Sequence, residues 1–400
     1  MKVAIIHDWL VSQRGGENVL DAICEMFPRA DLYTLIYVPG QVSGNIARLN
    51  RHVSVLQKLP SARERYRHLL PLMPWAIERF DMSPYDLILS SSHCVAKGVR
   101  KRADAYHMSY IHAPMRYMWD RFDEYFAPGR YSPLTRMAAR ALRPWLRNWD
   151  LRSAGRVDHF LANSKFIAAR IKEYYGRDAD VVYPFCETEQ FSVSRKPGRF
   201  YLMVAALVPY KRVDLAIEAF NRMKKPLLVV GDGPDRARLE KLARQEGAEN
   251  VEFLSGIRGL SLADMYAKCK ALVFPGIEDF GIVPIEAMSA GAPVIAFGSG
   301  GALETVTSET GVFFDEATVD GLIAAVRKFE EKSGKQGFDS EACRARGRQF
   351  NRARFQREFW AALKAHVPAR IWSSAETAGI ALGLEPASPE AGSIARNPRP

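Results

Sequence analysis

The chain has 400 residues, of which 48% are hydrophobic and 25% charged, and its formal net charge is +11. This balance excludes a disordered or fibrous protein, and the length exceeds what one ordinary core supports, so we expect two domains. The positive charge favours an anionic partner, for which nucleic acid, anionic lipid and a phosphorylated substrate all qualify.

The sequence predicts neither a membrane span nor a disulfide framework. No stretch approaches about 18 uninterrupted apolar residues, and the N-terminus lacks the layout of a signal peptide, so we expect a cytoplasmic protein. The cysteines are odd in number and form no CxxC pair, which predicts reduced thiols and no zinc site. They are Cys24, Cys94, Cys186, Cys269 and Cys343.

The first half alternates apolar strands with amphipathic helices. KVAIIHDWL predicts a buried strand, and SQRGGENVLDAICEMF predicts a tight glycine loop followed by a helix. Further strands are expected at YDLILSSS, HMSYIHAP and VDHFLANS, each ending in small or polar residues. This alternation predicts a parallel sheet covered on both faces.

A basic stretch follows between Gly129 and Arg156, where seven arginines accompany a single acid, Asp150. Tryptophans and leucines are interleaved among these arginines. The composition suits an interfacial anchor on anionic lipid. The alternative is a solvated helix pair that places Trp145 and Trp149 in the core.

The same alternation of strands and helices restarts after a segment near Tyr183 to Arg199, beginning with the strand FYLMVAALV. A second α/β domain is therefore expected there. Near the end, Ser340 to His366 predicts one long arginine-rich helix. The tail from Ser373 is rich in Ala, Pro, Gly and Ser, which predicts disorder.

The segment ALVFPGIEDFGIVPIEAMSAGAPVIAF is the most informative about chemistry. Glu278 is expected in the loop beyond a strand and Glu286 in the first turns of the next helix, so both can face one ligand site. The backbone N–H groups where this helix begins are suited to a phosphate. The residues that lead into the helix are Phe280, Gly281, Ile282 and Val283.

With these motifs in view, the chain resembles the retaining glycosyltransferases of family 4, whose signature is two glutamates eight positions apart. The resemblance is to the mannosyltransferase-like branch associated with bacterial O-antigen and exopolysaccharide assembly. Besides the glutamate segment, it is carried by HDWLVSQRGGENVL, HAPMRYMWD, FLANSKFIAARI, ALVPYKRVDLAIEAF, VVGDGPDRARLE and GSGGALETV.

The resemblance implies an α/β fold of the GT-B type, with two Rossmann-like doubly wound domains facing across a cleft. A C-terminal helix is expected to pack back toward the first domain. Ligands of such domains bind at the carboxyl ends of the strands. The expected divisions are an acceptor domain at 1–190, a donor domain at 191–345, a crossing helix at 346–372 and a tail at 373–400.

In the second domain, the resemblance assigns Glu278 to hydroxyls of the donor sugar and Glu286 to those of the ribose. Lys211 and Arg212 follow the first strand of this domain, where two cations suit a departing diphosphate. At Ala206 the chain departs from the family, because many relatives carry an arginine of the phosphate clamp there. The residues implied to border the base pocket are Gly231, Gly256 and Ile257.

In the first domain, Gly15 and Gly16 let the backbone approach a phosphate closely while the following helix presents its N-terminus. The resemblance places His112 beside the transferred sugar, where it is expected to orient the sugar rather than act as a base. Arg116 and Asp120 lie nearby in sequence and could touch the acceptor.

The implied reaction transfers a hexose, mannose from GDP-mannose, to a lipid-linked glycan at the inner leaflet. A covalent intermediate needs a carboxylate nucleophile beside the anomeric carbon, and none is evident. Resemblance instead implies front-face substitution, in which the departing phosphate oxygen takes the acceptor's proton. Since no DxD-like cluster stands where a nucleotide-bound metal would need it, we expect no metal and no cofactor.

Two alternatives remain open. A nucleotide-sugar epimerase could use the same fold, and product analysis without acceptor separates it from a transferase. A basic nucleic-acid-binding protein would fit the charge, but no helix-turn-helix, RNP-like aromatic motif or zinc spacing supports it.

Overall fold

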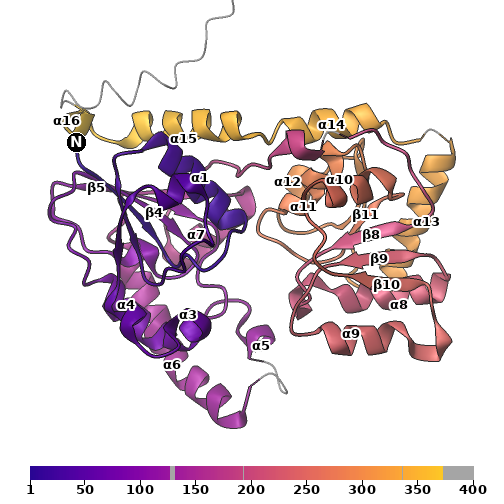
Figure 1. The fold of residues 1–400 in the computed structure, drawn as a ribbon, viewed down its shortest axis with the longest axis horizontal. Helices are drawn as coiled ribbons and strands as arrows, with labels where there is room; N and C mark the ends of the chain where they lie inside the picture. The colour runs from indigo at the N-terminus through magenta and orange to yellow at the C-terminus, as the bar shows by residue number, and fades with distance from the viewer. Residues whose placement is uncertain (127–130, 192, 336, 373–400) are drawn as a thin grey trace, which may run out of the picture.

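The computed structural model describes residues 1–126, 131–191, 193–335 and 337–372, which form two parallel α/β domains (Figure 1). The first sheet has seven strands in the order β3-β2-β1-β4-β5-β6-β7, and the second has six in the order β10-β9-β8-β11-β12-β13. In both sheets the order reverses next to the first strand of the domain, which is the doubly wound arrangement. The predicted tail from Ser373 lies outside the described residues.

The first domain is built from seven strands and seven α-helices along the described chain. Its strands are β1 Val3–His7, β2 Asp31–Thr34, β3 Asn50–Val53, β4 Leu87–Ser92, β5 Tyr106–Ile111, β6 His159–Ala162 and β7 Ala179–Val181. Its helices are α1 Gly15–Met26, α2 Gly44–Ala47, α3 Ala62–Arg65, α4 Met73–Ile77, α5 Phe122–Tyr125, α6 Pro133–Ala154 and α7 Lys165–Tyr175.

Both faces of the first sheet are buried, which explains why its central strands are continuously apolar. Ile5 of β1 packs in the core cluster that includes residues of α1. Its neighbour Ile6 points to the opposite face and packs in the cluster that includes residues of α4 and α6. The predicted parallel sheet with helices on both faces is confirmed.

The second domain repeats this plan with shorter connections. Its strands are β8 Tyr201–Val204, β9 Leu227–Val230, β10 Val251–Leu254, β11 Leu272–Phe274, β12 Val294–Phe297 and β13 Gly311–Phe314. Its helices are α8 Val213–Met223, α9 Arg236–Ala243, α10 Gly259–Lys268, α11 Ile282–Ser289, α12 Ala302–Thr305 and α13 Val319–Lys335.

The prediction of one long helix over Ser340–His366 is wrong. The structure has α14 at Ser340–Arg348 and α15 at Arg352–His366, and Asn351 caps α15 by accepting the N–H of Arg354. The break lies where the chain passes from one domain to the other, since α14 packs on α11 and α15 on α1 (Figure 1).

As predicted, the C-terminal helix α15 packs back onto the first domain. Arg352 at its start contacts carboxylates at Asp21 (2.7 Å), Glu25 (2.8 Å) and Glu187 (2.9 Å). Phe355 packs into the core cluster of the first sheet. A short helix, α16 at Ala369–Trp372, follows.

Two further expectations can be compared with the described residues. None of their helices is both long enough and apolar enough to cross a membrane. All five cysteines are buried free thiols.

Candidate active site

The loops that follow β8 and β11 bring two of the predicted site residues together. Lys211 ends a short 3-10 turn after β8, and Glu278 lies in the loop between β11 and α11. Their side chains form an ion pair and are only 15% and 19% exposed. Gly276 permits this approach, since a Cβ there would lie 2.8 Å from the Tyr210 carbonyl oxygen.

Helix α11 begins directly after this loop, as the sequence predicts. Gly281 precedes it with φ at +89°, a left-handed conformation that glycine adopts without strain. Ile282 and Val283 form its first turn, and Phe280 is buried beneath the loop. The first N–H groups of the helix therefore lie a few residues from Glu278.

Glu286 lies on the second turn of α11 and accepts a hydrogen bond from the Tyr266 hydroxyl at 2.8 Å. Burial raises the pKa of Glu286 to about 7, and the nearby charge of Glu278 adds to the rise while the Tyr266 hydroxyl opposes it. The two predicted glutamates are thus near enough to influence each other.

The glycine pair Gly15 and Gly16 forms the start of α1 rather than a loop before it, and it lies between His112 and α11. A Cβ added to Gly16 would be 3.7 Å from the His112 ring, and one on Gly15 would be 2.9 Å from Cδ1 of Ile282. The predicted phosphate-binding features of both halves therefore meet at one place on the domain boundary.

His112 follows β5 and its Nε2 lies 2.8 Å from the Ser91 hydroxyl, which is also 3.1 Å from Nδ1 of His7. Burial lowers the pKa of His112 well below its usual range, and the positive charges of His93, His7 and Arg116 add to this. The imidazole is therefore neutral at pH 7. A neutral ring can hydrogen-bond a sugar hydroxyl, which agrees with an orienting role.

Asp8 supports this part of the site, although sequence reasoning gave it no role. Its fully buried carboxylate follows β1 and accepts four consecutive backbone N–H bonds from His93 to Ala96, at 2.6 to 3.0 Å. These bonds fix the loop after β4 beside His112. The sequence does contain a signal for this role, because Asp8 is an acid placed directly after an apolar strand.

Two arginines of the first domain reach the Glu278 loop, and neither contact was predicted. Arg116 forms an ion pair with Asp279, and Arg121 donates to the Ile277 carbonyl at 2.9 Å. Asp120, in contrast, pairs with Arg170 at 2.8 Å. The sequence offers no periodic signal for such contacts between domains.

The GSGG segment supports the Glu278 loop from behind. The Gly301 N–H donates to the Glu278 carbonyl at 2.9 Å, and a Cβ on Gly301 would overlap the backbone of Phe280. Glu304, two residues into α12, accepts the N–H groups of Lys165 and Phe166 at 2.8 and 3.0 Å. The Glu304 contacts attach α12, which supports the Glu278 loop, to the start of α7 in the first domain.

The remaining predicted residues are not drawn into this cluster. Arg212 has φ at +52° and a side chain 39% exposed that lies 3.5 Å from Asp214. Gly231 follows β9, where a Cβ would overlap the Ala205 carbonyl, so close packing of two loops already requires glycine there. Gly256 and Ile257 follow β10 at the edge of the sheet.

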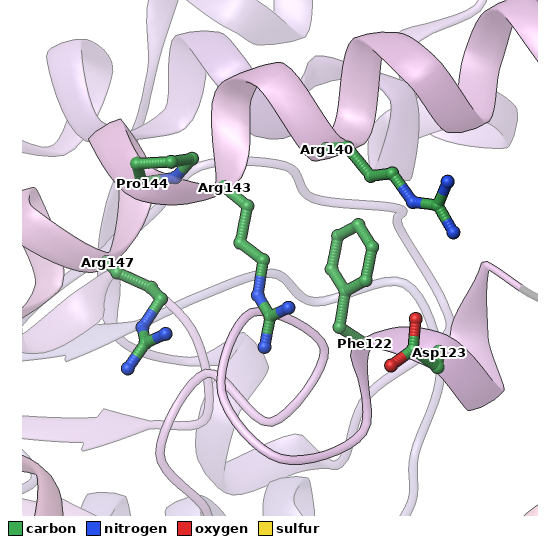
Figure 2. A pocket seen from close by; sticks show the side chains of 6 residues that line it. All are labelled: Phe122, Asp123, Arg140, Arg143, Pro144 and Arg147. Carbon is green, nitrogen blue, oxygen red and sulfur yellow. The ribbon is translucent and has the colours of Figure 1, made fainter.

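The basic stretch forms α6, and its side chains divide between structural contacts and solvent. Trp149 is buried, whereas Trp145 is exposed. Arg143 donates to the Met118 and Trp119 carbonyls at 2.8 and 2.7 Å. A hollow of about 590 Å³ lies beside α6. Figure 2 shows the side chains that line it, which are Phe122, Asp123, Arg140, Arg143, Pro144 and Arg147.

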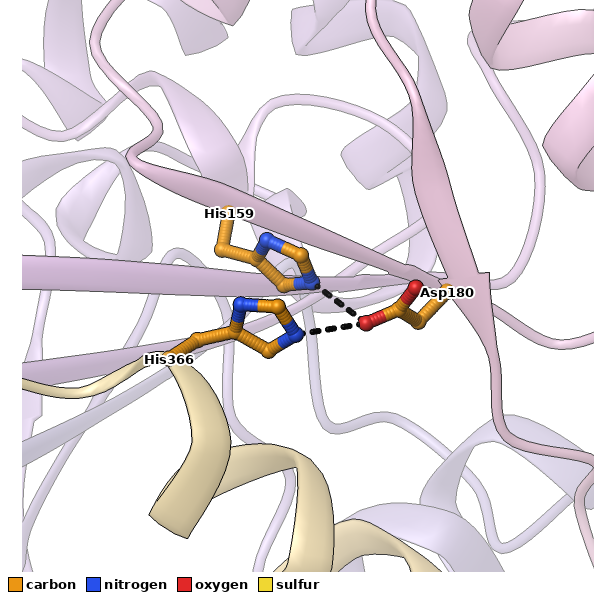
Figure 3. A group of neighbouring side chains, drawn as sticks. All are labelled: His159, Asp180 and His366. Carbon is orange, nitrogen blue, oxygen red and sulfur yellow. Dashed lines mark hydrogen bonds and ion pairs between the residues drawn. The ribbon is translucent and has the colours of Figure 1, made fainter.

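One group of side chains with metal-ligating atoms occurs among the described residues, and it lies outside this site. Nε2 of His159 and Nε2 of His366 lie 3.1 and 2.6 Å from the same Asp180 oxygen (Figure 3). His159 begins β6, so the group lies at the amino end of the strands, opposite the end that carries His112. Its hydrogen bonds join the end of α15 to the sheet edge.

Comparisons with known proteins agree with the resemblance. Residues 13–190 match the family model described as Glycosyltransferase Family 4, and residues 186–349 match the model described as Glycosyl transferases group 1. Together the two models span nearly all of both domains.

Among curated proteins, the chain is 33% identical over 153 residues to the GDP-mannose-dependent alpha-(1-6)-phosphatidylinositol monomannoside mannosyltransferase of Mycolicibacterium smegmatis. It is 28% identical over 206 residues to the O-antigen chain mannosyltransferase C of Escherichia coli. The matches cover 34% and 46% of this chain and 40% and 55% of those proteins, so about half of each relative is matched.

Among solved structures, the sucrose-phosphate synthase of Thermosynechococcus elongatus superimposes with a TM-score of 0.68 at 17% identity. The alignment covers 91% of this chain and 99% of that one. At this identity the likeness concerns the fold, and it agrees with the predicted pair of Rossmann-like domains.

Proposed function

The chain belongs to the family 4 glycosyltransferases, and from that membership we propose that it transfers a hexose from a nucleotide sugar to an acceptor with retention of configuration. The observation that carries the proposal is the meeting of the Lys211–Glu278 pair, the start of α11 and the Gly15–Gly16 start of α1 at one place. Two domains contribute to that place, so the donor and the acceptor can each bind on a different domain.

The donor diphosphate lies between the glycine start of α1 and the start of α11. Free N–H groups and the positive end of the helix dipole favour an anion there. Lys211 adds a full positive charge, which becomes more valuable as negative charge builds on the leaving phosphate. These groups supply electrostatic stabilisation from the chain itself, and we propose transfer without a metal.

The sugar and the ribose lie on opposite sides of the diphosphate. Glu278, beside Lys211, accepts hydrogen bonds from sugar hydroxyls, and His112 orients the same sugar from the first domain. Glu286 binds the ribose hydroxyls. Without a nucleophilic carboxylate assigned, the acceptor attacks from the face that the phosphate leaves, and the departing phosphate oxygen receives its proton.

We propose GDP-mannose as the donor and a lipid-linked glycan as the acceptor. The donor follows from the mannosyltransferase names of the relatives, one of which is GDP-mannose-dependent. The acceptor follows from α6, where exposed apolar side chains accompany arginines in a pattern suited to an anionic lipid surface.

The test is a panel of nucleotide sugars, with release of nucleoside diphosphate and the fate of the sugar both measured. We expect turnover of GDP-mannose, release of mannose without acceptor, and full activity in the presence of EDTA. Turnover of UDP-sugars alone would defeat the donor proposal. An isomerised nucleotide sugar as the only product would defeat the transferase proposal.

A further inference from the structure

A second cation faces the proposed donor site from the first domain. Arg116 lies four residues beyond His112, and its guanidinium forms an ion pair with Asp279, the residue after Glu278. The side chains are 25% and 15% exposed, so both charges are largely removed from water. The pair therefore links the His112 loop of one domain to the Glu278 loop of the other.

The charge of Arg116 acts on His112 and is acted on by Glu278. After burial and two histidines, its charge is among the causes that lower the pKa of His112. Burial lowers the pKa of Arg116, but the negative charges of Asp279 and Glu278 more than offset this and leave it raised. Arg116 thus lies within electrostatic reach of both residues that we propose to hold the sugar.

The Asp279 carboxylate offers Arg116 anionic oxygen acceptors, as a phosphate would. A guanidinium binds carboxylates and phosphates alike through paired N–H donors. Burial raises the pKa of Asp279, and the charge of Arg116 opposes this. A buried ion pair gains little net stability over apolar packing. A role in ligand exchange gives a functional reason for its presence at this boundary.

We propose that Arg116 binds the sugar-linked phosphate of the donor and that Asp279 holds the guanidinium in position until the donor arrives. The inference rests on the proposed function, because it presumes a nucleotide sugar at this boundary. The exchange is non-covalent, with one guanidinium moving from a carboxylate to a phosphate. It gives the leaving group a cation from the first domain in addition to Lys211 from the second, where Ala206 stands in place of a basic residue.

The experiment compares binding of GDP and GMP by calorimetry, with UDP and UMP in parallel. Only the diphosphates carry the β-phosphate, to which the transferred sugar is attached in the donor. Arg116→Gln should weaken the diphosphate about tenfold or more, the usual worth of a charge-assisted hydrogen bond, and leave the monophosphate within about twofold. Asp279→Asn should leave diphosphate binding unchanged or make it tighter, since the competing carboxylate charge is gone.

Arg121→Gln is the matched control, because Arg121 crosses the same boundary but donates to a backbone carbonyl. It should keep the wild-type ratio of diphosphate to monophosphate affinity. Thermal unfolding of each variant separates loss of binding from loss of fold.

A different result is expected if the Arg116–Asp279 pair only holds the two domains together. If Arg116→Gln and Asp279→Asn weaken diphosphate and monophosphate alike, the inference is overturned. It is also overturned if Arg116→Gln binds the diphosphate as well as wild type does, which leaves the proposed function standing. Wild-type protein that binds neither diphosphate overturns the proposed function and the inference with it.

Discussion

The Lys211–Glu278 contact places opposite charges on the two groups proposed to hold the leaving phosphate and the sugar. Each side chain restricts the other, so both are oriented before a donor binds. Such preorganisation matters for catalysis because no reorganisation remains to be done when charge develops.

Replacing either partner of this pair should slow transfer more than it weakens donor binding. We expect Lys211→Ala to lower kcat by about 100-fold or more, the usual cost of losing one group that stabilises transition-state charge. Glu278→Gln should also lower kcat. The double variant should lose much less than the product of the two effects, because the residues act as a unit.

Steady-state kinetics with the preferred donor measures this, and Arg222→Ala provides a control. Arg222 lies on α8 and pairs with Asp320 at the surface. Full multiplicativity of the Lys211 and Glu278 effects would contradict the coupling.

The pKa of Glu286, raised to about 7 by burial, predicts a pH-dependent stability. A carboxyl with a raised pKa binds its proton more tightly in the folded state than in the unfolded state. Its contribution is therefore full below the unfolded value of 4.5 and is lost as the pH rises through about 7. The unfolding free energy of wild type relative to Glu286→Gln should fall by up to about 1.4 kcal/mol per pH unit in this range.

Urea unfolding of both proteins at pH 5, 6, 7 and 8 checks the sign. A difference that stays constant over this range, or that grows with pH, would contradict the raised pKa of Glu286.

Part of the site could be predicted from local sequence. The loop position of Glu278, the helix position of Glu286 and the glycine before α11 follow from local sequence, and the structure places them so, while the roles of the two glutamates stay predictions. The Arg116–Asp279 pair joins residues 163 positions apart on different domains, so no local pattern reports it. The four bonds to Asp8 likewise depend on β1 and β4 being neighbours.

At the scale of elements, α6 is attached to the first domain by a buried charge pair. Lys97 forms an ion pair with Asp150 of α6, and both side chains are at most 1% exposed. Asp150 also accepts the Trp119 indole N–H at 2.7 Å and the Tyr175 hydroxyl at 2.8 Å. The only acid in the basic stretch is thus a structural residue.

Breaking this pair on one side should be costly. Asp150→Asn leaves Lys97 buried and unpaired, and we expect it to lower the unfolding free energy by about 3–5 kcal/mol. Adding Lys97→Met should recover part of that loss, because the uncompensated charge is removed. Exposed Arg152→Ala on the same helix should change stability by less than about 0.5 kcal/mol.

Denaturant unfolding of these variants gives the values. A loss for Asp150→Asn no larger than that of the Arg152→Ala control, or a double variant that is no more stable than Asp150→Asn, would contradict the role of the buried pair.

The outer face of α6 should bind anionic membranes. Leu134 and Met137 are 69% and 64% exposed on a helix rich in arginine. Replacing both with serine should weaken binding to phosphatidylglycerol vesicles about tenfold or more, since each large apolar side chain contributes on the order of 1.5–3 kcal/mol when buried. Salt should weaken binding of the wild type.

Vesicle co-sedimentation measures this, with Leu260→Ser as the matched control. Leu260 is 77% exposed but lies on α10 of the second domain. Equal losses for the α6 variant and the Leu260 variant would contradict a specific membrane face, as would equal binding to neutral vesicles.

At the scale of the whole molecule, the alternation of strands and helices predicted two parallel domains because each sheet is buried on both faces. The order of the strands within each sheet was not predicted, since right-handed crossovers fix the hand of a connection but not which strands become neighbours. The break between α14 and α15 was missed, because the arginine-rich helical pattern of residues 340–366 continues on both sides of it. Packing on two different domains interrupts that helix, and Asn351, a residue type favoured at helix N-caps, is the local signal of the restart.

The account depends on both domains holding one diphosphate, and calorimetric binding of GDP to Gly16→Val and Lys211→Ala tests this directly. A Cβ at Gly16 would be in ordinary van der Waals contact with the His112 ring, whose nearest atoms are at 3.7 Å, and thermal unfolding checks that the valine variant is folded. The added methyl groups would then occupy space that we assign to the phosphate. We expect each variant to weaken the binding of GDP at least tenfold relative to the binding of guanosine. Lys211→Ala removes a charged contact with the phosphate, and Gly16→Val blocks the close approach of the phosphate to the backbone. Normal GDP affinity in folded Gly16→Val, with a loss confined to Lys211→Ala, would contradict it.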